Sequence, residues 1–237
     1  MPIPALQEMR ERLIVALDVS NAKAAHDLMR RIGDGAVFYK VGLQLFTSEG
    51  PGFVAELTRS GRKVFLDLKL HDIPNTVAHA IQSARGLGVS MLTVHASGGA
   101  EMLKAAVEAA GPQLIVLAVT VLTSLTEQRL QEIGVLGGTT DQVLRLAALA
   151  QTAGCRGVVA SPQEVSPLRQ AFGDGLVIVS PGIRPSSADK NDQQRIATPR
   201  EAIRAGANHL VVGRPITDAN HPAQAVEAIL AEMSNQH

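Results

Sequence analysis

Short apolar segments recur along the whole chain, and the spacing between them leaves room for a helix after each one. Their interiors are nearly continuous runs of aliphatic residues, such as LIVAL near the N-terminus and LIVLAV near the middle. Continuous apolar runs are typical of strands that are buried on both faces, as in a parallel sheet. The eight predicted strands are residues 13–19, 36–42, 63–70, 91–96, 114–121, 157–161, 176–182 and 209–215.

The segments between these strands carry helical patterns with helical start and stop residues. Pro74, Pro199 and Pro222 stand in predicted first turns, where the missing N–H costs nothing because it would have no helical partner. Glycines such as Gly33 and Gly206 follow predicted last turns and can end a helix in the left-handed conformation. The predicted helices are residues 21–32, 44–59, 74–87, 99–110, 139–153, 163–172, 199–205 and 222–233.

Eight β–α alternations without a break in composition predict an α/β fold, namely a single-domain (β/α)8 TIM barrel over residues 1–237. An open, doubly wound sheet is the alternative. The connection of residues 184–198 is long, polar and irregular, and such loops in compact domains are usually functional. We therefore expect this connection to contribute to a functional site.

The composition and the length of the apolar runs argue against a nucleic-acid-binding protein and a membrane protein. Lys+Arg and Asp+Glu both number 22, so there is no basic excess for binding nucleic acid or an anionic membrane. The longest apolar runs are strand-sized, well below the roughly 20 residues of a membrane helix. The N-terminal segment is charged and does not resemble a signal peptide, so we expect a soluble, cytoplasmic protein. The single cysteine, Cys155, has small or apolar neighbours and is interpreted as an inert packing residue.

Charged side chains interrupt the apolar strands at their carboxyl ends. In the segment VFLDLKLHDIP, Asp67 and Lys69 stand two positions apart and therefore on one face of a strand. Asp18 and Lys40 end the first two strands, and Asp72 follows the third. Neighbouring strands of a barrel would bring these charges within a few ångströms of one another, where their alternating signs offset much of the desolvation cost.

Such a cluster predicts catalysis by a fixed cation, because a protonated lysine held over a substrate by carboxylates can act as a general acid. The alternative is an ion-pair network that only joins the third strand to its neighbours. This alternative explains any one of these residues better than it explains the whole set. His71 should point away from Lys69 and suits packing or hydrogen bonding. His95 ends the fourth strand and suits site lining or a half-buried structural role equally.

A second group of residues predicts an anion site. The segments SPGIR and VGRP follow the seventh and eighth strands, where barrels of this class usually bind phosphate. Each has a glycine that lets backbone N–H groups approach a ligand, and Arg184 or Arg214 adds a forked donor. Two surface arginines after tight turns are the alternative. Neither metal-ligand spacing nor a glycine-rich dinucleotide motif occurs, so we expect neither a metal nor a cofactor.

In these motifs the chain resembles the orotidine 5′-phosphate decarboxylase family. The longest matching motif is FLDLKLHDIPNTV at residues 65–77. Its D-x-K-x-x-D element is shared with a wider superfamily of phosphate-binding decarboxylases and aldol-type enzymes, but together with Lys40 and the PGIR and VGR motifs it is specific. The other matching motifs are IVALDV at 14–19, YKVGLQLF at 39–46, AVTVLTS at 118–124, PGIR at 181–184, NDQQRIATP at 191–199 and VVGRPIT at 211–217.

The resemblance implies roles for individual residues. The family's catalytic charge network matches Lys40, Asp67, Lys69 and Asp72. Its substrate-binding positions match Asp18, Lys40, Thr76, Thr123, Arg184, Gln193, Gly213 and Arg214. Among these, Asp18 would bind a ribose hydroxyl and Thr123 would contact the pyrimidine ring. Gln193, Gly213 and Arg214 would contact the phosphate. Arg184 would stand at the base of a mobile lid formed by residues 184–198.

The resemblance also implies a homodimer, and it leaves one phosphate contact open between two adjacent residues. In the family, the residues that match Asp72 and Thr76 reach the active site of the second subunit, so the resemblance implies a homodimer with shared sites. Gln194 is adjacent to Gln193, and the phosphate contact could therefore belong to either residue.

The implied activity is the cofactor-independent decarboxylation of orotidine 5′-monophosphate to UMP, the last step of de novo pyrimidine nucleotide synthesis. Loss of CO2 leaves a carbanion at C6 that a fixed cation, Lys69, would stabilise and then protonate. One alternative is a metal-dependent sugar-phosphate lyase of the same superfamily, which uses an acid near the place that Lys40 holds. The other is a non-catalytic phosphate-binding barrel, which would not need alternating Asp and Lys.

Overall fold

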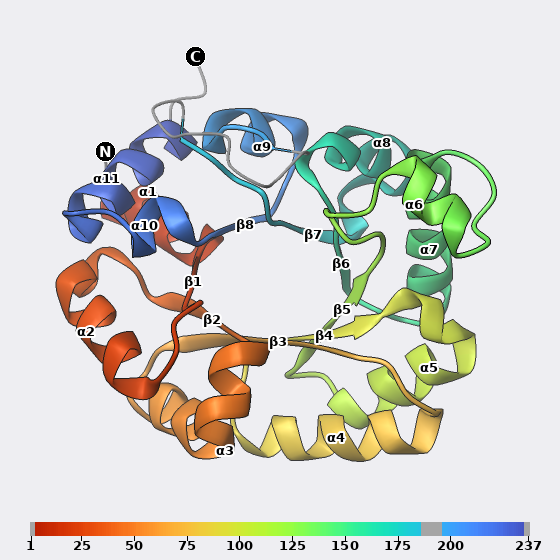
Figure 1. Cartoon of the computed structure of the whole chain (residues 1–237), viewed down its shortest axis with the longest axis horizontal. Helices are drawn as coiled ribbons and strands as arrows, with labels where there is room; N and C mark the ends of the chain where they lie inside the picture. The colour runs from red at the N-terminus through yellow and green to blue at the C-terminus, as the bar shows by residue number, and fades with distance from the viewer. Residues whose placement is uncertain (1–2, 186–195, 235–237) are drawn as a thin grey trace.

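All eight strands are parallel and close into one barrel in the order of the sequence (Figure 1). The computed structural model describes the backbone of residues 3–185 and 196–234. Closure comes from β1 and β8, which pair in parallel through Leu13 with Leu210 and Ile14 with Val211, so the open-sheet alternative is excluded. The strands are β1 (Leu13–Ala16), β2 (Phe38–Gly42), β3 (Lys63–Leu70), β4 (Met91–His95), β5 (Ile115–Val119), β6 (Gly157–Val159), β7 (Val177–Ser180) and β8 (His209–Val212).

A helix follows each strand and packs on the outside of the barrel, which confirms the predicted alternation (Figure 1). Pro74, Pro199 and Pro222 begin their helices as expected, and Thr198 and Glu201 form a capping box at the start of α9. None of the helices in the described residues is long and apolar enough to cross a membrane. These eight helices are α2 (Ala22–Ile32), α3 (Leu43–Arg59), α4 (Pro74–Gly86), α5 (Gly99–Ala110), α7 (Thr139–Thr152), α8 (Pro162–Phe172), α9 (Pro199–Ala205) and α11 (Pro222–Ser234).

Several short elements were not predicted from the hydrophobic pattern. They interrupt connections or precede the first strand, where no long apolar run marks them. Three of them are α-helices and three are single 3-10 turns. They are α1 (Ile3–Arg12), α6 (Glu127–Glu132), α10 (Arg214–Thr217), η1 (Gly33–Gly35), η2 (Ala96–Gly98) and η3 (Gly173–Gly175).

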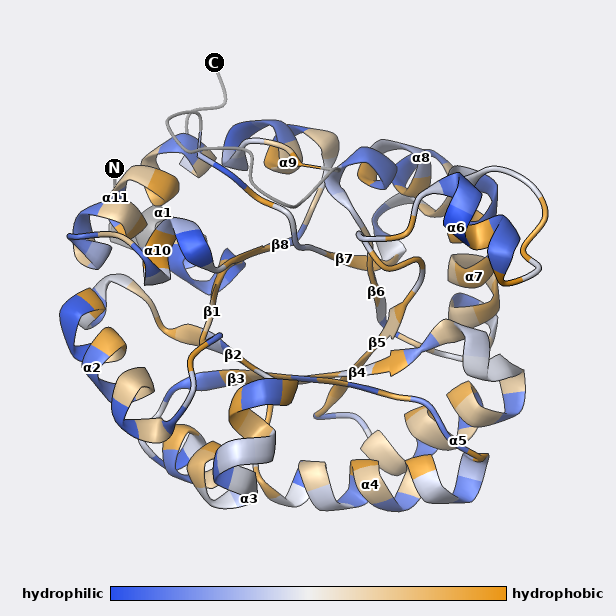
Figure 2. Cartoon of the chain, in the orientation of Figure 1, coloured by the Kyte–Doolittle hydropathy of each residue, from blue (hydrophilic) through white to orange (hydrophobic). Residues whose placement is uncertain are grey.

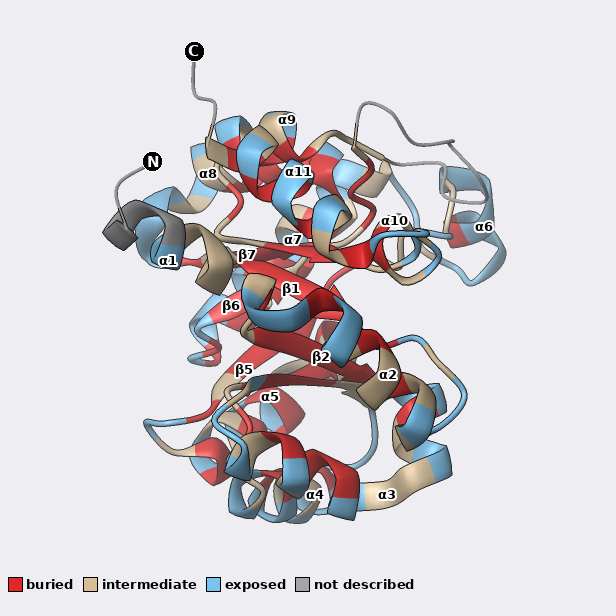
Figure 3. Ribbon diagram, turned by 90° about the vertical axis from the view of Figure 1, so that its left-hand side faces the viewer, coloured by how far each residue is buried: buried red, intermediate tan, exposed pale blue. Residues whose placement is uncertain are grey.

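The apolar side chains form two layers, one inside the barrel and one between the barrel and the helices. Figure 2 shows the apolar strands at the centre and polar residues on the outer sides of the helices, and Figure 3 shows the buried strands between them. The outer layer includes Cys155, where burial raises the thiol pKa to about 12, in keeping with the predicted packing role. The inner layer consists of Ile14, Ala16, Phe38, Phe65, Met91, Leu117, Val179 and Val211.

The helix α1 lies against the amino-terminal ends of the strands, on the side away from the predicted site. The Arg12 guanidinium donates to the backbone carbonyls of Ala207 (2.9 Å) and Asn208 (3.1 Å) just before β8. A ring nitrogen of His209, Nδ1, lies 3.1 Å from the carbonyl oxygen of Glu11. These contacts tie the N-terminal segment to the last strand and so complete the closure of the barrel.

We expect the stability of the fold to fall in acid because of His209. Burial lowers the pKa of this histidine from 6.5 to about 4, and the nearby cations Arg12 and Lys63 act in the same direction. Because the unfolded chain binds the proton more tightly, stability is fully present above pH 6.5 and is lost as the pH falls toward 4. The full loss corresponds to about 3 kcal/mol.

Urea unfolding of the wild type and of His209→Gln at several pH values between 4 and 7 measures this contribution. The difference in the free energy of unfolding between the two proteins should shrink as the pH falls. A difference that stays constant over this range would show that the histidine does not cause the acid sensitivity.

Candidate active site

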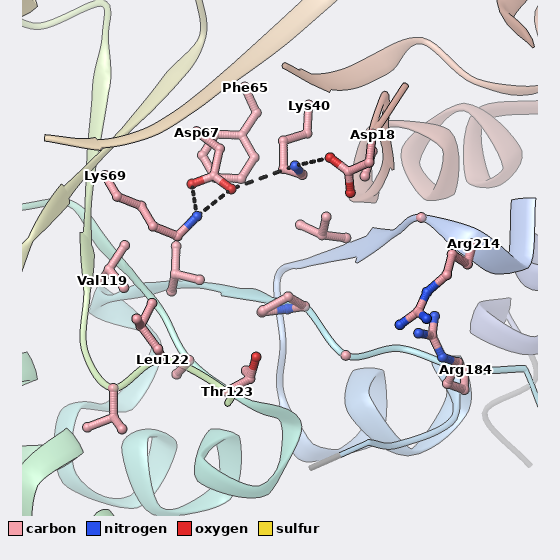
Figure 4. Close-up of a pocket in the computed structure, with 18 residues that line it drawn as sticks. Asp18, Lys40, Phe65, Asp67, Lys69, Val119, Leu122, Thr123, Arg184 and Arg214 are labelled. Carbon is pink, nitrogen blue, oxygen red and sulfur yellow. Dashed lines mark hydrogen bonds and ion pairs between the residues drawn. The ribbon is translucent and has the colours of Figure 1, made fainter. Parts of the chain in front are cut away.

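Four charged side chains from three neighbouring strands form a continuous line at the carboxyl end of the barrel (Figure 4). Lys69 Nζ lies 2.8 Å from Oδ1 and 2.9 Å from Oδ2 of Asp67. Lys40 Nζ lies 3.8 Å from Asp67 Oδ2 and 2.8 Å from Oδ1 of Asp18. The predicted convergence of these four residues is therefore confirmed, with the signs alternating along the line.

The central members of this line are the most buried. The Lys40 and Asp67 side chains are 11% and 13% exposed, whereas those of Lys69 and Asp18 are 31% and 57% exposed. A buried charge without a partner would be strongly unfavourable, and here each buried charge faces an opposite one. All four residues line the cavity, and Lys69 is the more exposed of the two lysines.

The position of Lys40 requires a glycine next to it on the strand. A side chain at Gly42 would place its Cβ 2.9 Å from Lys40 Nζ and 3.4 Å from Asp18 Oδ1. The distance to Lys40 is shorter than van der Waals contact, so a larger residue would force the Lys40 ammonium group to shift, whereas the distance to Asp18 is an ordinary contact. The last residue of β2 is thus small because the cluster occupies the space beside it.

The backbone of β3 departs from a regular strand where it carries the two catalytic candidates. The pairing of β3 with β4 shifts between Leu66 and Leu70, and Lys69 has a φ of 52°. The sequence argument assumed a regular strand with a two-residue repeat. Asp67 and Lys69 do share one side of the chain, but they do so through an irregular and left-handed backbone.

The cavity in front of the charge line has a volume of about 270 Å³ and two chemically different ends. Apolar side chains of β3, β5, β6 and β8 form its wall beside the charges, together with Thr123. At the opposite end, Arg184 and Arg214 point toward one another (Figure 4). Two converging guanidinium groups attract an anion, and the adjoining Gly182 and Gly213 leave their backbone accessible.

Most residues predicted for the site line this one cavity. Gln193 and its neighbour Gln194 lie outside the described residues, as does most of the predicted lid. The ends of that connection are joined by a hydrogen bond of 2.9 Å from the N–H of Arg184 to the carbonyl of Ala197. The predicted residues that line the cavity are Asp18, Lys40, Asp67, Lys69, Thr123, Arg184, Gly213 and Arg214.

Comparisons with known proteins agree with this geometry. Residues 11–229 match the model of the family described as orotidine 5′-phosphate decarboxylase / HUMPS. The chain belongs to this family. A relative from Anaeromyxobacter sp. (strain K), named orotidine 5′-phosphate decarboxylase, is 54% identical over 93% of this chain and 97% of its own length. A crystal structure of orotidine 5′-phosphate decarboxylase from Lactobacillus acidophilus has 41% identity and a TM-score of 0.84, covering 94% of this chain and 98% of its own.

The family relationship and the barrel were both expected from the motifs, and both are confirmed. A second relative, from Nitrosococcus oceani and also named orotidine 5′-phosphate decarboxylase, is 51% identical over 95% of this chain and 99% of its own. These relatives are matched along nearly their whole length.

Asp72 is the exception to the predicted convergence. The carboxylate is exposed, does not line the cavity and accepts a hydrogen bond of 2.6 Å from the N–H of Ile73. Thr76, one turn into α4, is also exposed and outside the cavity. The chain leaves β3 at Leu70 and turns outward before α4, so a single chain does not bring Asp72 to the other four charges. Within one chain the structure brings together four of the five charges, and a place for Asp72 in the second subunit's site stays a prediction of the family resemblance.

The two histidines near the site do not line the cavity either. His95 is half-buried at the end of β4, and burial lowers its pKa, with further contributions from the charges of His71 and Lys69. The lowered pKa favours the neutral form of the ring. His71 is exposed, and its ring centroid lies 5.4 Å from that of His95. Of the two roles considered for His95, the half-buried structural one fits the geometry.

Several residues at the site can be recognised only from their place in the barrel. The apolar wall of the cavity includes Phe65, Val119 and Val211, which read as ordinary strand residues. Thr93 on β4 contacts both Asp67 and Lys69 through its hydroxyl group. Thr93 is a polar residue in the middle of an apolar strand, and this position was the only signal in the sequence. The sequence did not show which neighbouring strand its hydroxyl group would face.

Proposed function

We propose that this protein decarboxylates orotidine 5′-monophosphate to UMP and CO2 without a metal or an organic cofactor. The observation that carries the proposal is the partly buried Lys69–Asp67–Lys40–Asp18 line at one end of a cavity with Arg184 and Arg214 at the other. A nucleoside monophosphate with a charged base has complementary groups at the same two ends. Membership of the family supports the same substrate.

In the proposed reaction, Lys69 acts on the carbon that loses CO2. The bond between C6 and the carboxylate breaks, and its electron pair remains on C6 as CO2 departs. The Lys69 ammonium, held by both oxygens of Asp67, stabilises this charge and then donates a proton to C6. Lys69 regains a proton from water after the product leaves.

The other members of the line hold the substrate and the lysine in place. Asp67 lies where the substrate carboxylate would depart, and Lys40 balances it from the opposite side. Asp18 is the most exposed of the four and can accept a hydrogen bond from a ribose hydroxyl. The apolar wall and Thr123 would face the pyrimidine ring and exclude water from C6.

The arginine end of the cavity would bind the phosphate. Arg214 follows Gly213 directly after β8, and Arg184 follows Gly182 after β7, which matches the usual phosphate position in barrels of this type. Binding energy from this remote group can be used to close the site and orient the reacting carbon. A phosphate contact from Gln193 and a lid over residues 184–198 remain predictions.

Independence of metal ions is supported by the pairing of the acids. Asp18 and Asp67 would be the natural oxygen ligands of a divalent cation, but lysine ammonium groups lie within 2.8 Å of both. These ammonium groups would repel a metal ion. Full activity after treatment with EDTA would agree with this assignment, whereas loss of activity that Mg²⁺ restores would favour the lyase alternative.

The direct test is to monitor the ultraviolet absorbance of orotidine 5′-monophosphate with purified, chelated protein, and to measure UMP binding by calorimetry. The expected result is loss of the substrate spectrum together with release of CO2. Binding of UMP without turnover would instead favour a non-catalytic phosphate-binding barrel. A cytoplasmic location remains a prediction from the sequence.

We also propose that the active form is a homodimer in which Asp72 and Thr76 complete the partner's site. Both residues are exposed outside the cavity of their own chain, beside Ile73, which is 67% exposed. Leu43, at the carboxyl end of β2, is another large apolar residue with 57% exposure on this side of the barrel. Exposed apolar residues next to exposed polar residues fit a symmetric interface.

Mixing two inactive variants tests the shared site. In a hybrid of Lys69→Ala with Asp72→Ala, one of the two sites contains neither substitution. Random pairing after unfolding and refolding should therefore restore about a quarter of the wild-type activity. If Asp72 served its own chain, each site would keep one defect and the mixture would stay inactive. Sedimentation of the wild type reports the dimer independently.

A further inference from the structure

A buried threonine on β4 contacts both ends of the Asp67–Lys69 pair without lining the cavity. Thr93 is 0% exposed and lies between Leu92 and Val94 in an otherwise apolar strand. We infer that Thr93 is a positioning residue that holds Lys69 and Asp67 in their reactive arrangement. This inference rests on the proposed function and concerns the same site.

The hydroxyl group of Thr93 closes a ring of hydrogen bonds around the catalytic pair. It accepts from the backbone N–H of Lys69 at 2.9 Å and donates to Asp67 Oδ1 at 2.9 Å. The same Oδ1 accepts from Lys69 Nζ at 2.8 Å. One hydroxyl group therefore fixes the backbone of the lysine and the carboxylate that orients its ammonium group.

The backbone at this point needs such support. Lys69 is the one non-glycine residue in the described part of the chain with a positive φ, 52°, and this conformation is unfavourable for a side chain with a Cβ. The β3–β4 pairing runs from Leu66 with Leu92 to Leu70 with Val94, so four steps on β3 match two on β4. The Lys69 N–H lies within this irregularity and is bound by a side chain of the facing strand.

The chemistry of the residue is as important as its position. A hydroxyl group can accept one hydrogen bond and donate another at once. Here the Lys69 N–H needs an acceptor and the Asp67 carboxylate needs a donor. Valine has the same shape but can do neither. Serine keeps both functions and loses only a methyl group. The pair Thr93→Val and Thr93→Ser therefore separates the hydrogen bonds from the packing.

The expected result is a loss confined to the chemical step. Removing an outer-shell partner of a catalytic group typically costs 10- to 100-fold, so Thr93→Val should lower kcat by roughly that factor. KM for orotidine 5′-monophosphate and the affinity for UMP should stay within about threefold, because Thr93 does not touch the ligand. Thr93→Ser should recover kcat to within about threefold of the wild type.

Thr58→Val is the matched control. Thr58 lies on α3, and its hydroxyl donates to the carbonyl of Leu87 at 2.7 Å, away from the cavity. Its removal also deletes a threonine hydrogen bond, so it should lower the melting temperature without changing kcat. Equal values of kcat for Thr93→Val and the wild type would overturn the inference, as would a serine variant as slow as the valine variant.

A crystal structure of Thr93→Val gives a readout that does not depend on turnover. The expected change is a shift of the Lys69 backbone out of its left-handed conformation, with a longer Lys69–Asp67 contact. An unchanged geometry at residues 67–69 would overturn the inference even if the wild type were inactive on orotidine 5′-monophosphate. Inactivity of the wild type would count against the proposed function alone.

Discussion

Replacing Lys69 by alanine is expected to lower kcat by at least about ten-thousand-fold while the protein still folds and binds UMP. Lys69 Nζ contacts both oxygens of Asp67, and Lys69 lines the cavity and is more exposed than Lys40, so its removal takes away both charge stabilisation and the assigned proton donor. Asp67 retains Lys40 at 3.8 Å and the Thr93 hydroxyl at 2.9 Å, so the remaining cluster stays paired.

Steady-state kinetics with orotidine 5′-monophosphate, calorimetry with UMP and circular dichroism measure these effects together. Lys104→Ala provides the control, because Lys104 is a surface lysine on α5 that pairs only with the exposed Glu101 in the part of the chain described. The control should be as active as the wild type. Activity of the Lys69 variant within a hundredfold of the wild type would refute the general-acid role, since no other group is assigned to protonate C6.

Replacing Arg214 by alanine is expected to lower kcat/KM for the nucleotide by about 100- to 10,000-fold. The estimate follows from two charge-assisted hydrogen bonds between a guanidinium group and a phosphate, each contributing about 1.5–3 kcal/mol. Arg184 remains at the same end of the cavity, so some anion binding should persist. Arg214→Lys should recover part of the loss, because lysine keeps the charge but not the forked geometry.

Orotidine without its phosphate is the decisive comparison substrate. Its turnover should be slow with the wild type and nearly unchanged by Arg214→Ala, because the interaction that the mutation removes is absent. An equal loss on both substrates would mean that the substitution disturbs the reacting end instead of the phosphate end. Arg59→Ala, on the outer surface of α3, controls for a general effect of losing a guanidinium group.

The barrel could be predicted because each of its elements has a local signal. Strands buried on both faces need nearly continuous apolar runs, which occur eight times in the chain, and several of the helices between them begin at a proline or end at a glycine. The helices α1, α6 and α10 were missed, and the predicted eighth strand, residues 209–215, extends into α10, which begins at Arg214. Their positions depend on what they pack against, as with the contacts of Arg12 to the segment before β8.

The candidate site was predictable to the extent that parallel strands place their ends together. Asp18, Lys40, Asp67 and Lys69 each follow or interrupt a strand, so the parallel pairing of β1 with β2 and of β2 with β3 brings them into one cluster. Asp72 follows the same strand by only a few residues and yet lies outside, because the chain turns away before α4. Sequence distance does not give the direction of a turn.

The amino-acid sequence by itself determined the barrel, its family and the residue types that meet at its carboxyl end, because periodicity and motif spacing are local properties. Only the tertiary structure decided the irregular path of β3, the left-handed Lys69 and the contact of Thr93 with both catalytic side chains. These features depend on which atoms of β4 face β3. That pairing is a non-local contact between strands, stabilised by the packing of the whole barrel, and no pattern along one strand encodes it.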